Sequence, residues 1–197
     1  MKKIVLASSS STRHDVMNLF GFEYEIVKSL VEEHSDSKDP RQYVMDLSND
    51  KAISVSGQIK ENAIIIAADT VISYNNEIFE KPKSKEKAFE NIKKMIGKTS
   101  FLTTGVTIID TYQDKKIQFS CVTNIKFKDN ITDEEIKWYI NNESDIFNRA
   151  GYVILGKGIL FIESISGDYT NLYGLPIHEI CKKLEDLGYK MSDFINN

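Results

Sequence analysis

Hydrophobic and polar residues alternate along the chain in short blocks, and the first blocks predict a strand followed by a helix. Residues 4–7 form an apolar run that is typical of a short buried strand. After a stretch of serines, Val16, Leu19 and Phe20 have the spacing of three and four residues that indicates a helix. Gly21 is the residue type that ends such a helix, so the chain opens with a strand, a loop and a helix.

The next block predicts a second strand and a second helix. Residues 24–27 form the strand, and the polar, acidic segment 28–38 is expected to be a loop. The Asp-Pro pair at 39–40 supplies an N-cap and a proline at the first helical position, with Gln42 three residues after the cap. A helix should therefore begin there, and Lys51 should lie on it.

The strongest strand prediction covers residues 63–69. Three consecutive isoleucines flanked by alanines fit a strand that is buried on both faces, ending at Asp69. Residues 71–74 and 78–80 then bracket the pair Asn75-Asn76, which suits a tight hairpin turn.

The second half of the chain continues the mixture of strands and helices. Its patterns predict a helix capped by Ser84 and ended by Gly97, long strands at 101–110 and 116–127, a helix opened by the capping box at Thr132, glycine-rich strand segments at 152–165, and an amphipathic helix from Pro176 to Gly188. The order of elements indicates an α/β fold with a mixed sheet. Since no Pro-, Gly- or Ser-rich linker interrupts it, residues 1–197 are expected to form one domain, with two lobes around a cleft.

Composition narrows the class of protein. Hydrophobic residues make up 41% of 197 residues, which is enough for a sizeable core, and the formal net charge of −4 gives no general support for a nucleic-acid coat. No apolar stretch has the length of a membrane helix, and the N-terminal apolar run breaks into serines too soon for a signal peptide, so we expect a soluble cytoplasmic protein. The two cysteines, Cys121 and Cys181, are far apart in sequence and are interpreted as buried free thiols.

Asp69 is the first candidate for chemistry. A carboxylate directly after a buried strand must be paired, hydrogen-bonded or metal-bound to offset its desolvation. The ends of buried strands are also where α/β proteins place their ligand sites. A structural and a functional role are equally compatible with this position alone.

The serines at 8–11 lie between the first strand and the first helix. Their hydroxyls and the backbone N–H groups of a helix N-terminus suit a phosphate, and Arg13, one turn into the helix, has a planar fork that suits the same anion. Ordinary helix capping and a solvated surface arginine are the simpler explanations.

Three further charged residues come from separate segments. Glu33 lies in the acidic loop, Lys51 on the second helix, and Lys81 before Pro82 at the end of a short strand. Each alone has a simple explanation as a solvated side chain. Together with Asp69 and Arg13 they suit a site in which Mg²⁺ takes one or two carboxylates plus substrate phosphates and waters, while cations neutralise the remaining phosphate charge.

These residues and their order resemble the Maf family of nucleoside triphosphate pyrophosphatases, also called septum formation inhibitor proteins. The resemblance runs nearly from end to end. The matching segments are 6–10 with Arg13, Glu33, 51–52, 68–71, 81–82, 97–99, 104–106, 150–151, 167–169 and 174–176.

The resemblance implies an elongated fold of the Maf and inosine-triphosphatase type, with a curved mixed sheet and a central cleft. It also implies cleavage of a nucleoside triphosphate between the α and β phosphates, dependent on Mg²⁺ or another divalent cation such as Mn²⁺, by a homodimeric enzyme. In that picture Asp69 activates the attacking water or holds the metal with Glu33. The cations Arg13, Lys51 and Lys81 bind the triphosphate, and Ser8, Ser10 and Thr70 bind the substrate.

Departures from the family pattern fall where the substrate is selected. Ser10-Ser11 replaces Ser-Pro, Thr12 stands where Arg or Trp is common, and Arg149-Ala150-Gly151 replaces Lys-Ala-Gly. Leu155 replaces a glutamine and cannot make its amide hydrogen bonds. Thymidine, uridine and cytidine triphosphates and modified nucleotides therefore all remain candidate substrates.

Two other functions are compatible with the sequence. One is a catalytically weak regulator of division or septum formation that binds a nucleotide or a partner, since Thr12 and Leu155 depart from the pattern. The other is a single-stranded nucleic-acid binder that stacks bases on Tyr152, Tyr169 and Tyr173, which the acidic net charge makes less favourable.

Overall fold

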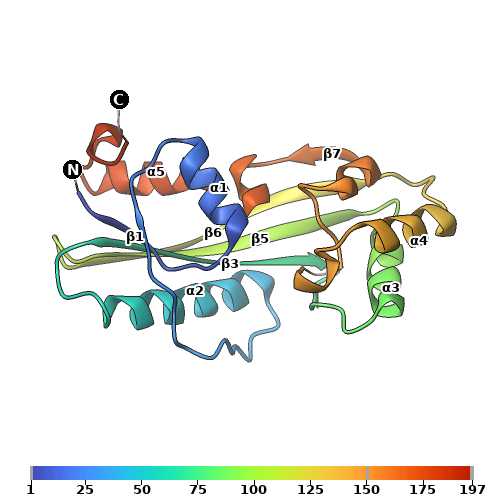
Figure 1. Ribbon diagram of the computed structural model, residues 1–197, viewed down its shortest axis with the longest axis horizontal. Helices are drawn as coiled ribbons and strands as arrows, with labels where there is room; N and C mark the ends of the chain where they lie inside the picture. The colour runs from blue at the N-terminus through green and yellow to red at the C-terminus, as the bar shows by residue number, and fades with distance from the viewer. Residues whose placement is uncertain (1, 150, 196–197) are drawn as a thin grey trace.

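The isoleucine-rich segment forms the centre of a mixed sheet in the computed structural model, which describes residues 2–149 and 151–195. β3 (Ile64–Tyr74) pairs in parallel with β1 (Ile4–Leu6) and antiparallel with β5 (Thr99–Asp110). The sheet order is β2-β1-β3-β5-β6-β7, and β4 also pairs with β3. The remaining strands are β2 (Glu25–Ile26), β4 (Glu77–Phe79), β6 (Lys115–Phe127) and β7 (Ile162–Ser166). The predicted mixed α/β sheet is thus confirmed, and Figure 1 shows an elongated molecule.

Helices cover both faces of this sheet, and their starts follow the capping signals in the sequence. The Asp39 side chain accepts a hydrogen bond from Arg41 N at 2.8 Å at the start of α2, and Thr132 and Glu135 form the expected capping box. The helices are α1 (Ser11–Leu19), α2 (Pro40–Ser56), α3 (Lys85–Met95), α4 (Asp133–Asn142) and α5 (Ile177–Asp186), with short 3₁₀ segments at Ile146–Asn148, Lys157–Phe161, Thr170–Tyr173 and Met191–Asp193.

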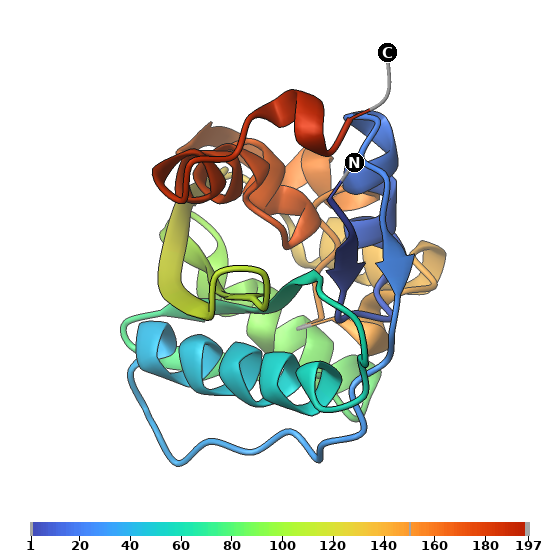
Figure 2. The same cartoon turned by 90° about the vertical axis from the view of Figure 1, so that its left-hand side faces the viewer.

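Alternate side chains of the central strands enter different cores. Ile65 and Ala67 pack with Ala52 and Val55 of α2 on one face, whereas Ile64 and Ile66 pack with α1 and α5 on the other. Figures 1 and 2 show α2 below the sheet and α1 and α5 above it. A strand with no polar face needs helices on both sides, so the isoleucine run accounts for this layering.

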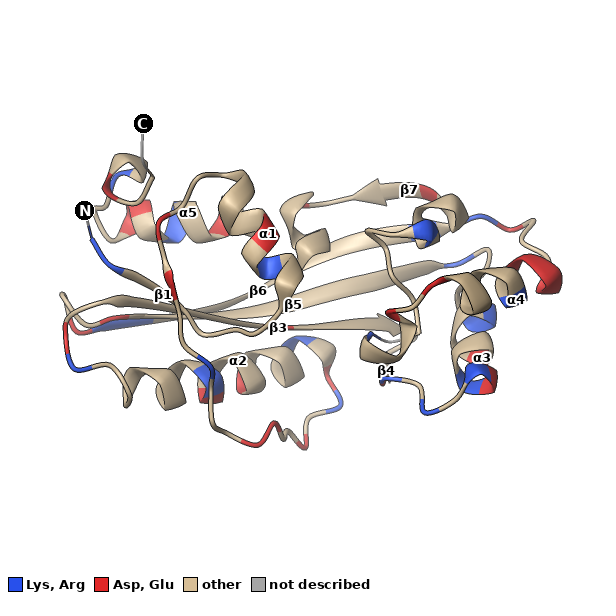
Figure 3. Cartoon of the chain, viewed as in Figure 1, with Lys and Arg blue, Asp and Glu red and all other residues tan. Residues whose placement is uncertain are grey.

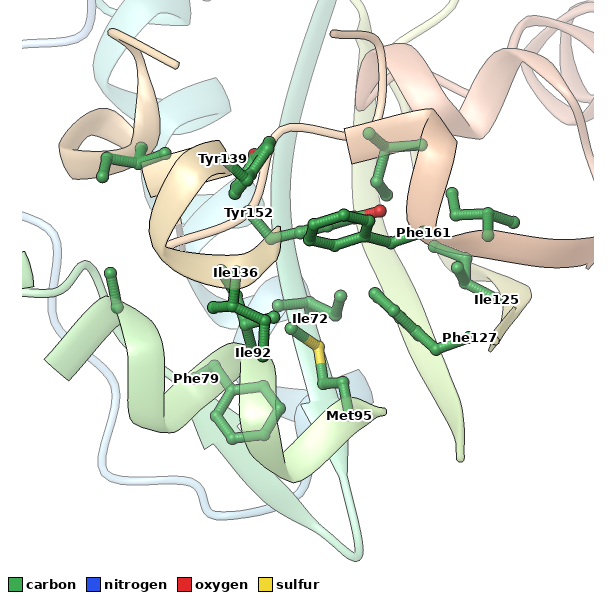
Figure 4. Packing of buried hydrophobic residues seen from close by; sticks show 14 of the residues in the cluster. Ile72, Phe79, Ile92, Met95, Ile125, Phe127, Ile136, Tyr139, Tyr152 and Phe161 are labelled. Carbon is green, nitrogen blue, oxygen red and sulfur yellow. The ribbon is translucent and has the colours of Figure 1, made fainter. Parts of the chain in front are cut away.

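A third core cluster fills the far end of the molecule. There α3 and α4 pack on β3, β5 and β6 around Ile72, Leu102 and Phe127. Figure 4 shows Tyr139 of α4 together with Tyr152 and Phe161, whose rings pack against one another within this cluster. The long strands β3, β5 and β6 therefore run through the cores at both ends of the molecule.

Three sequence-based predictions of local structure were wrong. The helix predicted from Val16, Leu19 and Phe20 is present as α1, but Leu19 and Phe20 at its end are exposed, and its buried side chains are Val16 and Met17. The segment 152–165 is mostly not strand: it contains a 3₁₀ turn, and only β7 is extended. Cys121 and Cys181 are half-buried rather than buried.

Candidate active site

Asp69 lies in the middle of β3, not after its end as the sequence had suggested. It is opposite Gly105 on β5, and β3 continues to Tyr74. On the other edge of β3, the pairing with β1 stops at Ile66 and the pairing with β4 starts at Ile72. Residues 67–71 therefore have a free edge among the described strands. Asp69 therefore lies at a gap in the sheet pairing and not at a strand terminus.

Lys51 and Asp69 form a buried ion pair at this gap. Lys51 Nζ on α2 lies 2.6 Å from Asp69 Oδ1, and the exposed fractions of the two side chains are 10% and 12%. Removal of either member of such a pair is destabilising, since it leaves the other charge buried and uncompensated. Asp69 Oδ2 has no hydrogen-bond partner in the described part of the chain, so it is free for a ligand.

Glu33 completes an acidic pair around the same ammonium group. Its carboxylate lies 3.0 Å from Lys51 Nζ, although its side chain is 55% exposed on the loop before α2. Glu33 and Asp69 thus come together, as the sequence predicted. Both carboxylates lie within hydrogen-bond distance of one nitrogen, so a cation and the two acids share a small volume at the edge of β3.

Arg13 is held in a fixed orientation on the opposite side of this gap. Its Nε donates to Gly174 O at 2.8 Å, its Nη1 to Ser8 Oγ at 3.3 Å and its Nη2 to Thr70 Oγ1 at 3.1 Å. Burial lowers the pKa of Arg13 from its ordinary value, the nearby negative charges of Asp69 and Glu33 oppose this, and the charge of Arg149 adds to it. Two arginines that repel each other across a cleft favour an anion between them.

The serine loop leads into the N-terminus of α1 without closing it. Ser8 Oγ accepts from Ser10 N at 3.1 Å, and the hydroxyls of Ser10 and Thr12 lie 3.0 Å apart. No side chain caps the helix at Ser10, so the simple capping explanation is not supported. Ser8 through Arg13 all line the cleft, where the first N–H groups of α1 suit an anion.

The far wall of the cleft carries Lys81, Arg149 and Leu155. Lys81 is exposed and forms no salt bridge with any residue that the structure describes. Arg149 Nε lies 3.0 Å from Asp145 Oδ2, and hydrogen bonds from Asn148 and Arg149 lower the pKa of Asp145. Leu155 is 40% exposed at the cleft, while Ala150 lies outside the described residues.

These walls enclose the central cleft that the sequence predicted. Its volume is about 880 Å³, and its lining includes each of the candidate residues: Ser8, Ser10, Thr12, Arg13, Glu33, Lys51, Asp69, Thr70, Lys81, Arg149 and Leu155. Cationic, hydroxyl and carboxylate groups from opposite ends of the chain thus face one space. The arrangement can hold a polyphosphate and place a carboxylate beside it.

Two carboxylates at Lys51 Nζ, those of Asp69 and Glu33, are the candidate ligands for a divalent cation. No group of three or more His, Cys, Asp or Glu side chains in the described ranges is arranged to hold a metal. Two carboxylates fit Mg²⁺ when substrate phosphates and waters provide its other ligands. The residues therefore fit a cation that arrives with the substrate better than a resident structural metal.

Gly105 and Gly174 lie in segments that carry the family resemblance, but sequence reasoning assigned them no role in holding the site in shape. Gly105 lets α2 approach the sheet, since a Cβ there would lie 2.6 Å from Met45 N. Gly174 has a left-handed φ of 73° and directs its carbonyl to Arg13. A glycine inside a strand is a signal of close backbone approach, so Gly105 could have been found from the sequence. The Gly174 contact spans 161 residues and carries no such local signal.

The structure removes one of the three stacking candidates. Tyr152 is 5% exposed and packs among Phe127, Tyr139 and Phe161 (Figure 4), and its hydroxyl donates to Gly158 O. Tyr169 is 60% exposed, with its ring edge-on to that of Tyr173. Figure 3 shows acidic residues interspersed among the basic ones along the described helices and loops, which does not favour a nucleic-acid backbone as the ligand.

Comparisons with known proteins give matches in sequence and in structure. The family model described as Maf-like protein matches residues 3–187. The chain is 40% identical over 178 residues to a dTTP/UTP pyrophosphatase of Thermoanaerobacter sp. (strain X514), covering 90% of this chain and 93% of that one. It is 38% identical over 186 residues to a dTTP/UTP pyrophosphatase of Clostridium perfringens (strain SM101 / Type A), covering 93% and 96%. Among solved structures, the Staphylococcus aureus Ham1 protein aligns with a TM-score of 0.45 at 13% identity, over 65% of this chain and 73% of that one.

Proposed function

The chain belongs to the Maf family, and we propose that it is a nucleoside triphosphate pyrophosphatase that hydrolyses dTTP and UTP to the monophosphate and pyrophosphate. The observation that carries the proposal is the Lys51–Asp69 pair at the free edge of β3, facing Arg13 across the cleft. Relatives that share up to 40% identity over nine tenths of the chain carry the name of this activity. A catalytically weak regulator is not favoured by these names.

The mechanism follows from the orientation of Asp69. With Oδ1 held by Lys51, the carboxylate presents Oδ2 to the cleft, where it accepts a hydrogen bond and then a proton from the attacking water. Oxygen of that water bonds to the α-phosphorus, and the bond from the α-phosphorus to the bridging oxygen breaks. The electron pair leaves with pyrophosphate, so negative charge grows on the β-phosphate side.

Cationic groups offset this developing charge. Arg13 is fixed by three hydrogen bonds and so keeps its remaining guanidinium surface directed at the anion without reorganisation. Lys81, which has no salt-bridge partner among the described residues, is available to a phosphate, and Arg149 supplies charge from the far wall. The Ser8–Ser10 loop supplies hydroxyl and backbone donors to the same chain of phosphates.

Asp69 and Glu33 would hold Mg²⁺ or Mn²⁺ together with the substrate phosphates. The cation, when bound, neutralises phosphate charge that the protein cations leave uncompensated. Support for this assignment is the position of both carboxylates at one ammonium group. Omission of the divalent ion should abolish turnover, and titration of Mg²⁺ into Asp69→Asn should fail to restore it.

Selection of the base is proposed to depend on Thr12 and Leu155. Both line the cleft, and Leu155 offers an apolar surface without hydrogen-bond partners. A buried polar group discriminates strongly between similar bases, because the wrong base leaves it without a hydrogen-bond partner. An apolar contact carries no such penalty and discriminates less. We therefore propose that the enzyme accepts both dTTP and UTP and discriminates weakly against CTP.

Assembly and location are proposed from the family. No described helix is both long and apolar enough to cross a membrane. A homodimer in the cytoplasm is what the family resemblance supports, and sedimentation of the purified protein tests the dimer. A role in septum formation rests on the same resemblance, and the cell shape of a deletion strain tests it.

The test of the function is a product assay. Purified protein with Mg²⁺ is given UTP, dTTP, CTP, ATP and GTP, and pyrophosphate is measured separately from orthophosphate. We expect pyrophosphate from UTP and dTTP, and none with Asp69→Asn. Release of orthophosphate, or no turnover of any nucleotide by the folded protein, would overturn the proposal.

A further inference from the structure

A loop far from Arg13 in sequence determines where its guanidinium lies. Residues 167–176 connect β7 to α5, and Gly174 among them accepts the Arg13 Nε hydrogen bond at 2.8 Å. A Cβ on Gly174 would lie 3.0 Å from Thr70 Oγ1 and 3.4 Å from Arg13 Nε. The backbone of this loop is thus packed directly against the arginine and against the hydroxyl that the arginine also contacts.

The hydroxyl of Thr170 joins the start of this loop to the start of α5. Thr170, which is 7% exposed, donates its hydroxyl proton to Asp168 Oδ1 at 2.6 Å and accepts from Ile177 N at 2.8 Å. Asp168 Oδ1 also accepts from Thr170 N at 2.7 Å. The single hydroxyl proton of Thr170 is thus used in the bond to Asp168. Gly174 lies between Thr170 and Ile177, the two residues that the hydroxyl connects.

The same loop is anchored to the sheet. Asn171, which is fully buried, donates from Nδ2 to Leu102 O at 3.1 Å and to Thr123 Oγ1 at 3.2 Å. Thr123 Oγ1 in turn donates to Asp168 O at 2.9 Å. Through these bonds β5 and β6 fix the height of the loop above the sheet, and with it the position of the Gly174 carbonyl.

Asp168 and Thr170 do not line the cleft, whereas Leu172, Tyr173 and Gly174 of the same loop do, together with Arg13 and Thr70. The network therefore acts on a ligand through the loop residues that line the cleft, and Gly174 is the loop residue that bonds to the Arg13 guanidinium. Its effect on ligand binding should therefore depend on the presence of the Arg13 guanidinium.

We propose that Asp168 and Thr170 are positioning residues that fix the Arg13 guanidinium toward a polyphosphate in the cleft. The inference rests on the proposed function only in naming a polyphosphate as the anion. A network that merely stabilises the fold would weaken binding to the same extent whether or not Arg13 is present. A positioning network loses its effect when the group that it positions is removed.

The test is a double-mutant cycle with inorganic tripolyphosphate as the probe and calorimetry as the measurement. Thr170→Val should weaken binding about tenfold in the full-length protein, and should weaken it no further in an Arg13→Ala background. Thr170→Ser keeps the hydroxyl and should restore the wild-type affinity. Equal weakening by Thr170→Val in both backgrounds, or no weakening in either, would overturn the proposal.

Thr111→Val is the matched control. Its hydroxyl is also bonded to backbone, accepting from Ala63 N at 2.8 Å, but at the end of β3 that is remote from the cleft. Tripolyphosphate affinity should be unchanged in this variant. If Thr170→Val does not fold, Asp168→Asn serves in the same cycle, because it keeps an oxygen acceptor, and its smaller loss of affinity should also vanish without Arg13.

The outcome is separable from that of the proposed function. Tripolyphosphate binding does not require turnover, so the cycle can show coupling in a protein that releases no pyrophosphate from UTP. Conversely, an enzyme that hydrolyses UTP but gives an additive cycle would retain its function and refute the positioning role.

Discussion

The backbone of Gly105 on β5 lies directly against the backbone of Val44 on α2. A Cβ on Gly105 would meet the Val44 carbonyl group and come within 2.6 Å of Met45 N. Gly105 is also the partner of Asp69 across the sheet, and Lys51 lies two turns after Val44 on α2. The depth of α2 on the sheet therefore fixes the distance between Lys51 and Asp69.

Replacement of Gly105 by alanine should damage both stability and activity. The obstructing atoms belong to backbone and cannot rotate away, so we expect the free energy of unfolding in urea to fall by about 1–3 kcal/mol. The displaced helix should also lower kcat in the fraction that remains folded. Gly57→Ala is the control, because Gly57 has helical φ and its nearest atoms lie at 3.7 Å, and it should be neutral or slightly stabilising. Equal stability of Gly105→Ala and wild type would contradict this account of the packing.

The Lys51–Asp69 pair should show an asymmetry between its two members. Lys51→Met leaves Asp69 buried without its hydrogen-bond partner, and should cost about 3 kcal/mol of unfolding free energy. Asp69→Asn should cost less, because Lys51 retains Glu33 at 3.0 Å. Both variants should lack pyrophosphatase activity.

An exposed ion pair provides the control for this prediction. Lys87 and Glu90 lie 3.5 Å apart on the surface of α3, with side chains that are 51% and 63% exposed. Lys87→Met should change the free energy of unfolding by less than about 1 kcal/mol. If Asp69→Asn proves the more destabilising of the two site variants, the assignment of Glu33 as a second partner of Lys51 is wrong.

Leu155→Gln should alter selectivity without altering stability. Leu155 is 40% exposed at the cleft, so an amide there can be solvated in the free protein and can bond to a base in the complex. We expect the ratio of kcat/KM for UTP to that for CTP to change by about tenfold. Leu19→Gln, at a 63% exposed position on α1, should leave both the ratio and the melting temperature unchanged. An unaltered ratio in Leu155→Gln would remove Leu155 from the base-binding region.

The two thiols should make the protein sensitive to alkaline pH. Burial, reinforced by the negative charge of Asp168, raises the pKa of both Cys121 and Cys181 from 9.0 to about 11. The folded state thus disfavours the thiolate, so this contribution to stability is complete below about pH 9 and is lost as the pH rises toward 11. Replacement of both cysteines by alanine should flatten the decline in melting temperature over that range. Rapid labelling of the native protein by a thiol reagent at pH 8 would contradict this prediction, because it would show thiols that are accessible and have a pKa well below 11.

Local signals predicted the parts of the fold that depend on neighbouring residues. The Asp39-Pro40 pair and the Thr132 capping box place helix starts correctly, because a cap acts within a few residues of its own position. Asp69 was misplaced at a strand end, because the gap in pairing beside it depends on where β1 stops and β4 begins. The turn at 157–161 was missed for a related reason: its apolar residues suit a strand, but the surrounding chain bends them into a 3₁₀ segment.

The site itself was predicted as a set of residues and not as an arrangement. Charge and spacing singled out Arg13, Glu33, Lys51 and Asp69, and the structure brings these together at one cleft. Their contacts could not be read from the sequence, since the Arg13 bond to Gly174 requires the last third of the chain to fold back over α1. Residues that shape a site through backbone contacts carry little chemical signal of their own.

Three strands connect the two ends of the molecule beneath the cleft. Ile66 and Val106 belong to the core packed by α1 and α5, while Ile72 and Leu102, further along the same two strands, belong to the core packed by α3 and α4. A hydrogen-bonded sheet resists bending far more than a loop does. The sheet therefore acts as a rigid spacer between the two ends of the molecule, and the parts of the cleft that β3 and β5 carry keep a constant separation.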